Sequence, residues 1–520
     1  MSESGIALII LAAAVLLFVW DRLPIAVIAL LVPLALWATG VLDLGEAVAG
    51  FGDPTVLFIA ALFVVSEALD SAGVTAAVGG FAMRLGGTSP SRLLTTVMLM
   101  VALLTALITP NGSVAALTPV IVVIAIRARR SPSELLMPAA FAGHAGSLLL
   151  LIGSPVTVVV ADYVESSGAG HLGLFGIGPI GLVLTVATIG VVLLFGSRLV
   201  PHRTSDTVLR DLSSHGPLLA DHYGLNDPGP ALMRRESGVA EYVVPPRSRF
   251  IGDRVYPGMV TESGELVVVA MHHKGHPVDG PGRLASGDSL ILQGSWRALN
   301  NAASDPDLMA VDDPEAVRRQ AVPLGSGTKR ALSVLLAMIV LLATGLVPAA
   351  VVGILAAIAM ILLRVVTVEQ AYSAISWTTI ILVGGMMSLS AAMVSSGAAQ
   401  LLAEGLVSLV GSAGPYALLA GLFLITAVLG QLISNMATAL IVIPIGLSAA
   451  AQMHISAMPV LVAIAVFAAA ALLTPVATPA NLMVQEAAGY RFGDYWKLGL
   501  PLLLLYGLVG VFAVPLLWPF

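Results

Sequence analysis

The stretch "LISNMATALIVIP", residues 432–444, puts polar side chains inside an apolar part of the chain. Ser434, Asn435 and Thr438 stand where a helix would otherwise pass through lipid. An unbroken helix pairs all of its own backbone groups, so an interruption here frees N–H and carbonyl groups beside short polar side chains. Asn also tolerates the left-handed backbone of a tight turn. The stretch therefore predicts the tip of a re-entrant helical hairpin that holds a polar solute.

The composition identifies lipid as the main solvent of the chain. Of the 520 residues, 58% are hydrophobic and 10% are charged, and the mean hydropathy is +0.98, whereas soluble domains carry about 25% charged residues. Apolar stretches recur along most of the chain, among them 5–20, 23–41, 181–195 and 498–518. The absence of cysteine excludes disulfides and thiolate metal sites. We predict an all-α polytopic membrane protein.

One region departs from this pattern, because charged residues gather between 201 and 328. Three short strand-like runs lie there, at 239–245, 265–273 and 288–294, separated by turns that contain Gly or Pro. We predict a first membrane half over 1–200, a polar linker with a small α+β domain over 201–328 (core about 236–303), and a second membrane half over 329–520.

The two membrane halves match when the chain is shifted by 324 residues. Residues 55–73 fall on 379–397, Asn111 falls on Asn435, and Ser154-Pro155 falls on Thr478-Pro479. A single offset without a net gap indicates an internal duplication. Duplicated halves with matching interruptions are typical of secondary transporters.

The charges of the loops predict that the two halves are inverted. Residues 127–130, "RARR", are basic, whereas the equivalent residues 451–454, "AQMH", contain no Lys or Arg. Because basic short loops stay in the cytoplasm, the two loops are expected on opposite sides of the membrane. The basic flanks of the insert predict that it lies in the cytoplasm. We expect the protein in the inner (plasma) membrane of the cell, with both termini outside.

Four interruptions supply the candidate site. The hairpin tips are "LITPNGSVAALTP" (107–119) and "LISNMATALIVIP", and later helices are broken at "IGSPVTVV" (152–159) and "TPVATPANLMV" (474–484). None of them contains Lys or Arg, so helix N-termini are expected to supply positive potential to an anion. The candidate substrate-binding residues are Asn111, Gly112, Ser113, Ser154, Pro155, Thr157, Asn435, Met436, Thr438, Thr478, Pro479 and Asn481.

The tip at 434–435, the break at 474–481 and residues 489–502 resemble the divalent-anion/sodium symporter family of the ion-transporter superfamily. The resemblance implies sodium-coupled transport of dicarboxylates, citrate or sulfate, a homodimer, and no organic cofactor. It also implies Na⁺ sites at two sets of residues, which are Asn111, Ser113, Gly153 and Ser154 in one half and Ser434, Asn435, Thr474 and Thr478 in the other.

This sequence departs from the family pattern at three places. The family tips read Ser-Asn-Thr or Asn-Asn-Thr, whereas residues 110–113 read Pro-Asn-Gly-Ser and residues 434–436 read Ser-Asn-Met. In the first break, Thr157 stands where the family has Asn. These departures leave open the number of coupling ions and the identity of the anion.

The insert resembles a TrkA-C domain, the regulatory lobe of potassium-transport regulators. The matching stretches are "EYVVPPRSRFIGDRV" (241–255) and "GDSLILQGS" (287–295). The resemblance implies that a small regulatory ligand binds the insert.

Ionisable residues within or near the apolar stretches keep alternatives open, because such residues often carry function in membranes. They are Glu67, Asp70, His144, Asp162 and Glu486. A proton-coupled anion carrier and a sodium/proton antiporter are the alternatives to sodium symport. Intramembrane enzyme chemistry is not expected, because the sequence has neither H-E-x-x-H nor G-x-S-x-G.

Overall fold

The structure is a computed structural model. It describes residues 2–20, 22–74, 89–128, 130–203, 237–261, 263–273, 276–278, 280–312, 314, 317, 327–410, 413–475 and 477–520, without the side chains at 123, 127, 410 and 486. The chain divides into two compact units, one of residues 1–70, 78–208 and 329–520, and one of residues 71–77 and 209–328. We call the first the membrane unit and the second the insert.

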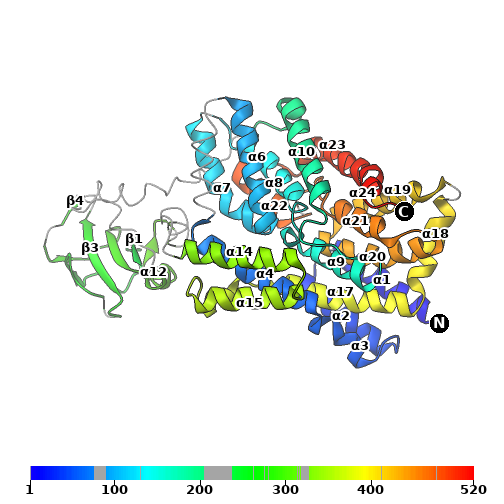
Figure 1. The fold of residues 1–520 in the computed structure, drawn as a ribbon. Helices are drawn as coiled ribbons and strands as arrows, with labels where there is room; N and C mark the ends of the chain where they lie inside the picture. Colours follow the sequence, from blue (N-terminus) through cyan, green and yellow to red (C-terminus); the bar gives the residue numbers. More distant parts are fainter. Residues whose placement is uncertain are drawn as a thin grey trace. The chain divides into compact units, whose positions relative to one another are not determined.

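The membrane unit consists of helices in two series (Figure 1). The first series is α1 (Glu3–Trp20), α2 (Ile25–Ala38), α3 (Leu44–Ala49), α4 (Pro54–Ser71), α6 (Pro90–Leu107), α7 (Pro110–Arg127), α8 (Ser133–Gly146), α9 (Pro155–Ser166) and α10 (Gly178–Leu199). The second is α14 (Thr328–Thr344), α15 (Ala349–Leu362), α16 (Val368–Ala374), α17 (Trp377–Ser395), α18 (Ala398–Val410), α19 (Pro415–Leu432), α20 (Asn435–Gln452), α21 (Ala457–Ala468), α22 (Pro479–Ala488), α23 (Tyr495–Leu508) and α24 (Val514–Leu517).

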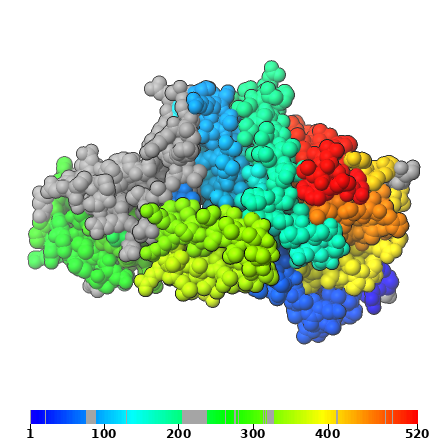
Figure 2. Space-filling view, viewed as in Figure 1, coloured from blue at the N-terminus to red at the C-terminus, as the bar shows by residue number. Residues whose placement is uncertain are grey.

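The surface of these helices is that of a membrane protein. Among the described residues, eight helices are long and apolar enough to cross a bilayer. Large apolar side chains such as Leu194, Leu362 and Leu516 are at least 75% exposed. Figure 2 shows α10 and the α14–α15 pair on the outside of the membrane unit. Exposed leucines on long apolar helices fit contact with lipid, which confirms the predicted all-α polytopic class.

The duplication reaches the first helices of each half. Asp43 caps α3 in a reciprocal capping box with Glu46, and Thr367 caps α16 in the same way with Gln370. These pairs are 324 residues apart. The structure therefore shows the same backbone plan in both halves.

After the broken helices, equivalent residues of the two halves are no longer 324 positions apart in the sequence. Gly181 on α10 packs against the carbonyl of Leu148, and a Cβ there would lie 2.3 Å from that oxygen. Gly499 on α23 packs in the same way against the carbonyl of Leu472, with a corresponding distance of 2.1 Å. Any side chain would clash, so glycine is required at both contacts. The connection that leads to α23 is shorter than the one that leads to α10, and this shifts the match from that point on.

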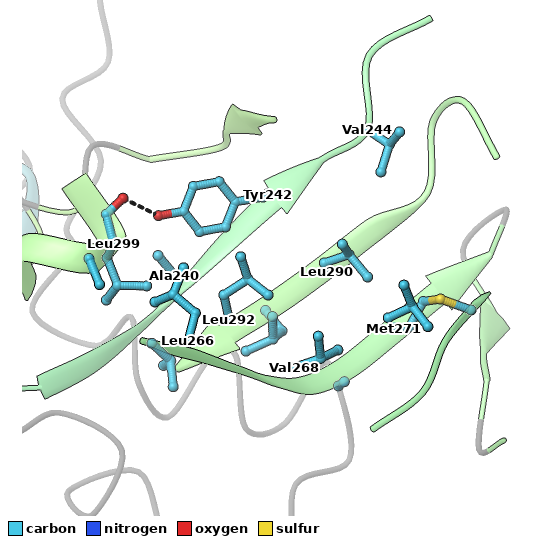
Figure 3. Close-up of a cluster of buried hydrophobic side chains, with 14 of the residues drawn as sticks. Ala240, Tyr242, Val244, Leu266, Val268, Met271, Leu290, Leu292 and Leu299 are labelled. Carbon is cyan, nitrogen blue, oxygen red and sulfur yellow. Dashed lines mark hydrogen bonds between the residues drawn. The ribbon is translucent and has the colours of Figure 1, made fainter. Parts of the chain in front are cut away.

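The insert contains a five-stranded antiparallel sheet in the order β4-β3-β6-β1-β7. The elements are β1 (Ser237–Val243), β2 (Arg254–Val255), β3 (Leu266–His273), β4 (His276–Pro277), β5 (Gly282–Arg283), β6 (Ser289–Ser295), α12 (Trp296–Ala303) and β7 (Met309–Ala310). β1, β3 and β6 coincide with the three predicted runs. Their apolar side chains form one core in which the Tyr242 hydroxyl donates to the Leu299 carbonyl at 2.6 Å (Figure 3).

Candidate functional site

Both predicted hairpin tips interrupt helices where the sequence indicated. α6 and α7 are joined by Ile108 and Thr109, and α19 and α20 are joined by Ile433 and Ser434, all four with extended backbones. One expectation is wrong. Asn435 does not adopt the left-handed conformation, because the extended pair reverses the chain and the asparagine begins the next helix.

The two predicted helix breaks are also present. α8 ends at Gly146 and α9 begins at Pro155, while α21 ends at Ala468 and α22 begins at Pro479. Proline suits a first helical position because its missing N–H would have no partner there. The tips and breaks therefore place four helix N-termini in the membrane unit, those of α7, α9, α20 and α22. Each N-terminus carries roughly half a positive charge.

The broken helices of the two halves pack across one another. α22 of the second half packs against α7 and α8 of the first half. α9 of the first half packs against α20 and α21 of the second. Candidate residues that are more than 300 positions apart in the sequence therefore belong to one assembly of helices.

The second tip contains two buried oxygens without hydrogen bonds among the described residues. They are Oδ1 of Asn435 and Oγ1 of Thr438, and the Thr438 side chain is fully buried. Other buried helical threonines, such as Thr105 and Thr426, donate to the carbonyl four residues earlier at 2.7 Å. Thr438 lacks that bond, as do the buried Thr185 and Thr188 of α10. A buried polar atom without a partner costs about 1–3 kcal/mol, so a ligand at this place is favoured.

In the second break, Asn481 is held at both ends of its amide. Nδ2 donates to the carbonyls of Ala471 at 2.9 Å and Thr474 at 3.1 Å. These acceptors fix the orientation of the amide, so Oδ1 must accept from Nε2 of His144 at 3.1 Å. His144 lies on α8 and is buried. One hydrogen bond thus joins the broken helices of the two halves.

Thr478 lies in the same cluster. Its hydroxyl is 3.4 Å from Nε2 of His144 and accepts from the backbone N–H of Asn481 at 3.3 Å. Thr474 stands close to the hairpin, with Oγ1 3.5 Å from the carbonyl of Gln431. The structure therefore places three residues of the second predicted break, Thr474, Thr478 and Asn481, around one buried histidine and one hairpin.

Gln431, which we did not predict, supports the second break from the hairpin. Its Nε2 donates to the Ala470 carbonyl at 3.2 Å, and its Oε1 accepts from the Leu473 N–H at 2.8 Å. The side chain thereby pairs two backbone groups that the break frees. The sequence signal for Gln431 is an amide side chain in an otherwise apolar helix, three positions before Ser434. The equivalent residue of the first half is Leu107.

Among the described residues, the tip and the break of the first half have fewer unpartnered polar groups than those of the second. Asn111 is exposed, and the buried Ser113 hydroxyl lies 2.5 Å from that of Thr105. The Thr157 hydroxyl lies 2.7 Å from the Leu151 carbonyl oxygen and 2.6 Å from that of Ser154. The position equivalent to Thr438 is Val114.

The other predicted residues have simpler surroundings. The Ser154 hydroxyl accepts from the Val156 N–H at 3.2 Å and caps α9, and the Ser434 hydroxyl caps α20 by accepting from the Ala437 N–H at 3.3 Å. A Cβ on Gly112 would lie 2.9 Å from the Ile108 side chain, and one on Gly153 2.5 Å from the Ser147 carbonyl oxygen. Met436 is buried on α20. Glu67, Asp70 and Asp162 are half-buried, and the side chain of Glu486 lies outside the described residues.

Comparison with known proteins agrees with a transporter. The model of the CitMHS family, described as citrate transporter, matches residues 15–439 and 339–520. The uncharacterized transporter YfbS of Escherichia coli K12 is 31% identical over 98% of this chain and 98% of its own length. Sodium/sulfate cotransporter 2 of Chlamydomonas reinhardtii is 30% identical over 45% of this chain and 27% of its own length.

A solved structure supports the fold. The YdaH transporter of Alcanivorax borkumensis, whose structure is described as having an unusual topology, matches with a TM-score of 0.52 and 16% identity, over 97% of this chain and 99% of that one. The family model spans nearly the whole chain, and the family and the relatives named above are transporters rather than enzymes. This chain therefore belongs to the CitMHS citrate transporter family of membrane proteins.

Proposed function

We propose that this transporter is a sodium-coupled symporter of a small divalent anion, in the sulfate or dicarboxylate class, that works by alternating access. The observation that carries the proposal is the pair of buried, unpartnered oxygens at Asn435 and Thr438. Transporters coordinate Na⁺ with backbone carbonyls that an interrupted helix frees, and neutral side-chain oxygens beside such an interruption can complete the set of oxygen ligands. A bound cation would offset the cost of burying these oxygens without partners.

The anion would bind at the helix N-termini. The four tips and breaks contain no Lys or Arg, so the first-turn N–H groups of α7, α9, α20 and α22 are the available donors. Such donors suit sulfate and carboxylate equally. The family description of a citrate transporter and the sodium/sulfate names of partial relatives support this range of anions.

The Na⁺ ligands, the dimer and the role of the insert are proposed from the sequence patterns and the family resemblance. Na⁺ would be held mainly at Ser434, Asn435, Thr474 and Thr478, one of the two sets that the family resemblance indicates, together with the unpartnered oxygen of Thr438. The other set, Asn111, Ser113, Gly153 and Ser154, would contribute less, because Asn111 is exposed. Two copies would form a dimer in the inner membrane through helices that do not carry the tips. The insert would lie in the cytoplasm as a TrkA-C-like regulatory domain, and its ligand would change the transport rate.

A proton-coupled anion carrier is the second candidate, and His144 is the observation that favours it. Its buried ring links Asn481 to α8 through a hydrogen bond. A change in the protonation of that ring would therefore act directly on the second break. A sodium/proton antiporter would use the same histidine without an anion.

Uptake into proteoliposomes tests these candidates. Radiolabelled sulfate, succinate and citrate are offered with an inward Na⁺ gradient, with K⁺ in its place, and with a pH gradient alone. Sodium symport predicts accumulation of at least one anion only with the Na⁺ gradient at fixed pH. Accumulation driven by the pH gradient without Na⁺ would establish the proton-coupled carrier instead. Cation-driven proton movement without any anion would establish the antiporter.

A further inference from the structure

The turn between α22 and α23 and the first residues of α23 divide into an inner and an outer set of side chains. The inner set is Tyr490, Asp494 and Tyr495, all of them buried. The Tyr495 hydroxyl donates to the Asn481 carbonyl at 2.6 Å. The Asp494 carboxylate accepts from Nε of Arg203 at 3.0 Å and from Nη2 at 2.8 Å. The inner set therefore fixes the turn to the membrane unit and pairs the one carboxylate between residues 489 and 497.

The outer set combines two aromatic rings with two cations. Phe492 is 57% exposed and Trp496 53%, and Arg491 and Lys497 are exposed as well. Neither cation forms an ion pair with a carboxylate in the part of the chain that the structure describes. An exposed Trp beside Lys or Arg is typical of the level of the lipid headgroups, where ring and charge each find a suitable environment. We call Arg491, Phe492, Trp496 and Lys497 the α23 anchor.

An exposed apolar stripe continues from the anchor along α23. Leu500, Leu504 and Leu508 follow Trp496 in steps of four residues, and they are 40%, 52% and 57% exposed. Side chains at this spacing lie on one face of a helix. A helix rises about 18 Å over the twelve residues from Trp496 to Leu508, and the hydrocarbon of one leaflet is roughly 15 Å thick. The stripe is therefore long enough to lie along the acyl chains of one leaflet, with the anchor at its edge.

The equivalent stretch of the first half has no such combination. Gly181 and Gly499 make equivalent contacts, so residues 491–497 correspond to residues 173–179, "GLFGIGP". That stretch exposes Phe175 but contains no Lys or Arg. The positive-inside rule accounts for the side of the membrane on which cations lie, but it does not account for the two exposed rings and the leucine stripe beside them.

We propose that the α23 anchor binds the phosphate headgroup of an anionic phospholipid, with an acyl chain along the leucine stripe. Arg491 and Lys497 supply the positive charge that the headgroup requires, because Asp494 is already paired with Arg203. The stripe selects a lipid rather than a free phosphate, since only a lipid has an acyl chain to place there. The inference does not depend on which ion or anion the protein transports.

Fluorescence quenching by brominated lipids tests the proposal in the full-length protein. The chain has six Trp residues, so the signal of Trp496 is the difference between each protein and the same protein with Trp496→Phe. Brominated phosphatidylglycerol is added to phosphatidylcholine membranes, with brominated phosphatidylcholine in parallel. We expect the Trp496 signal to show a preference for phosphatidylglycerol on the order of tenfold or more. Arg491→Gln and Lys497→Gln should each lower it about fivefold, and the double substitution should remove it.

Two variants serve as controls. Arg22→Gln changes another exposed arginine beside a tryptophan, with its Cζ 5.7 Å from the centroid of the Trp20 ring, and the preference at Trp496 should remain. Arg491→Lys retains the charge and should keep most of the preference. If the double variant does not fold, salt replaces it, because 0.5 M NaCl should weaken the preference of the native protein by screening the two charges.

Four results would overturn the proposal. Equal quenching of Trp496 by both lipids would show contact with lipid but no binding of an anionic headgroup. A preference that survives the double substitution, or that does not respond to salt, would show that Arg491 and Lys497 do not provide it. Displacement of the brominated lipid by soluble glycerol phosphate would identify a site for free phosphate. Absence of quenching at Trp496 would show that another protein surface, such as a second copy of this chain, covers the anchor.

Discussion

The two hairpins of the membrane unit share a backbone and differ in chemistry. Each has two extended residues at its tip and a helix that begins directly afterwards. The second buries two oxygens without partners, at Asn435 and Thr438, whereas the first exposes Asn111 and pairs the Ser113 hydroxyl. Two hairpins with the same backbone conformation therefore differ as binding sites. The unpartnered oxygens make the second hairpin the better candidate for a coupling-ion site.

The two helix breaks also differ, in how many of their backbone groups are hydrogen-bonded by side-chain amides. Gln431 and Asn481 hold four backbone groups of the second break with side-chain amides. The first half has Leu107 and Thr157 at the equivalent positions. These side-chain amides pair backbone groups at 470, 471, 473 and 474 that the end of α21 leaves without helical partners.

The largest effect is expected at the second tip. Thr438→Val keeps the shape of the side chain and removes the unpartnered oxygen, and Asn435→Ala removes the other one. Each should raise the Na⁺ concentration for half-maximal uptake about tenfold, since one lost ligand at a buried site is worth about 1–3 kcal/mol. Uptake of the responsive anion as a function of Na⁺ measures this. Unchanged sodium dependence in both variants would contradict the assignment of the site.

Gln431→Leu gives the second half the residue of the first, and we expect the next largest effect. The change leaves the Leu473 N–H and the Ala470 carbonyl without their partners, at a cost of about 1–3 kcal/mol for each buried group. The thermal unfolding temperature in detergent should fall, and Gln431→Glu should recover only the bond to the Leu473 N–H. Leu107→Gln in the first half is the matched control, for which no gain is expected. A neutral Gln431→Leu would show that the break needs no support from the hairpin.

His144→Ala tests the bond between the two halves. It leaves Oδ1 of Asn481 without its donor, so we expect a loss of stability on the order of 1–3 kcal/mol. His144→Gln retains an N–H donor and should restore much of the loss. Substrate-free thermal unfolding, measured at two pH values, compares the variants. If Ala and Gln behave alike, the hydrogen bond to Asn481 contributes little.

The smallest effect is expected at the first tip, where Asn111→Ala removes an exposed side chain. Sodium dependence should change by less than about twofold, because an exposed amide exchanges its bonds with water at little net cost. The measurement is the same Na⁺ titration of uptake used for Asn435→Ala. A loss as large as that of Asn435→Ala would show that both tips bind coupling ions equally.

The sequence predicts the features that leave a local mark. Pro, Ser and Asn inside apolar runs located all four interruptions, and β-branched runs located three strands of the insert. Gln431 was missed because its importance depends on which backbone groups the neighbouring break leaves unpaired. The pair of Arg203 with Asp494 joins residues almost 300 positions apart, and only the packing of both halves reveals it. The left-handed tip was a wrong inference because Asn can also begin a helix.

The central claim is that the same structural unit occurs twice in opposite orientations across the membrane. Ala128 follows α7, and its equivalent, Gln452, ends α20. The protein has no cysteine, so Ala128→Cys and Gln452→Cys can be labelled in intact cells with a membrane-impermeant thiol reagent, with lysed cells as the control. Inverted halves predict labelling of Gln452→Cys from outside and protection of Ala128→Cys until lysis. Equal labelling or equal protection of both, in folded and active variants, would contradict the inversion and the alternating-access mechanism that depends on it.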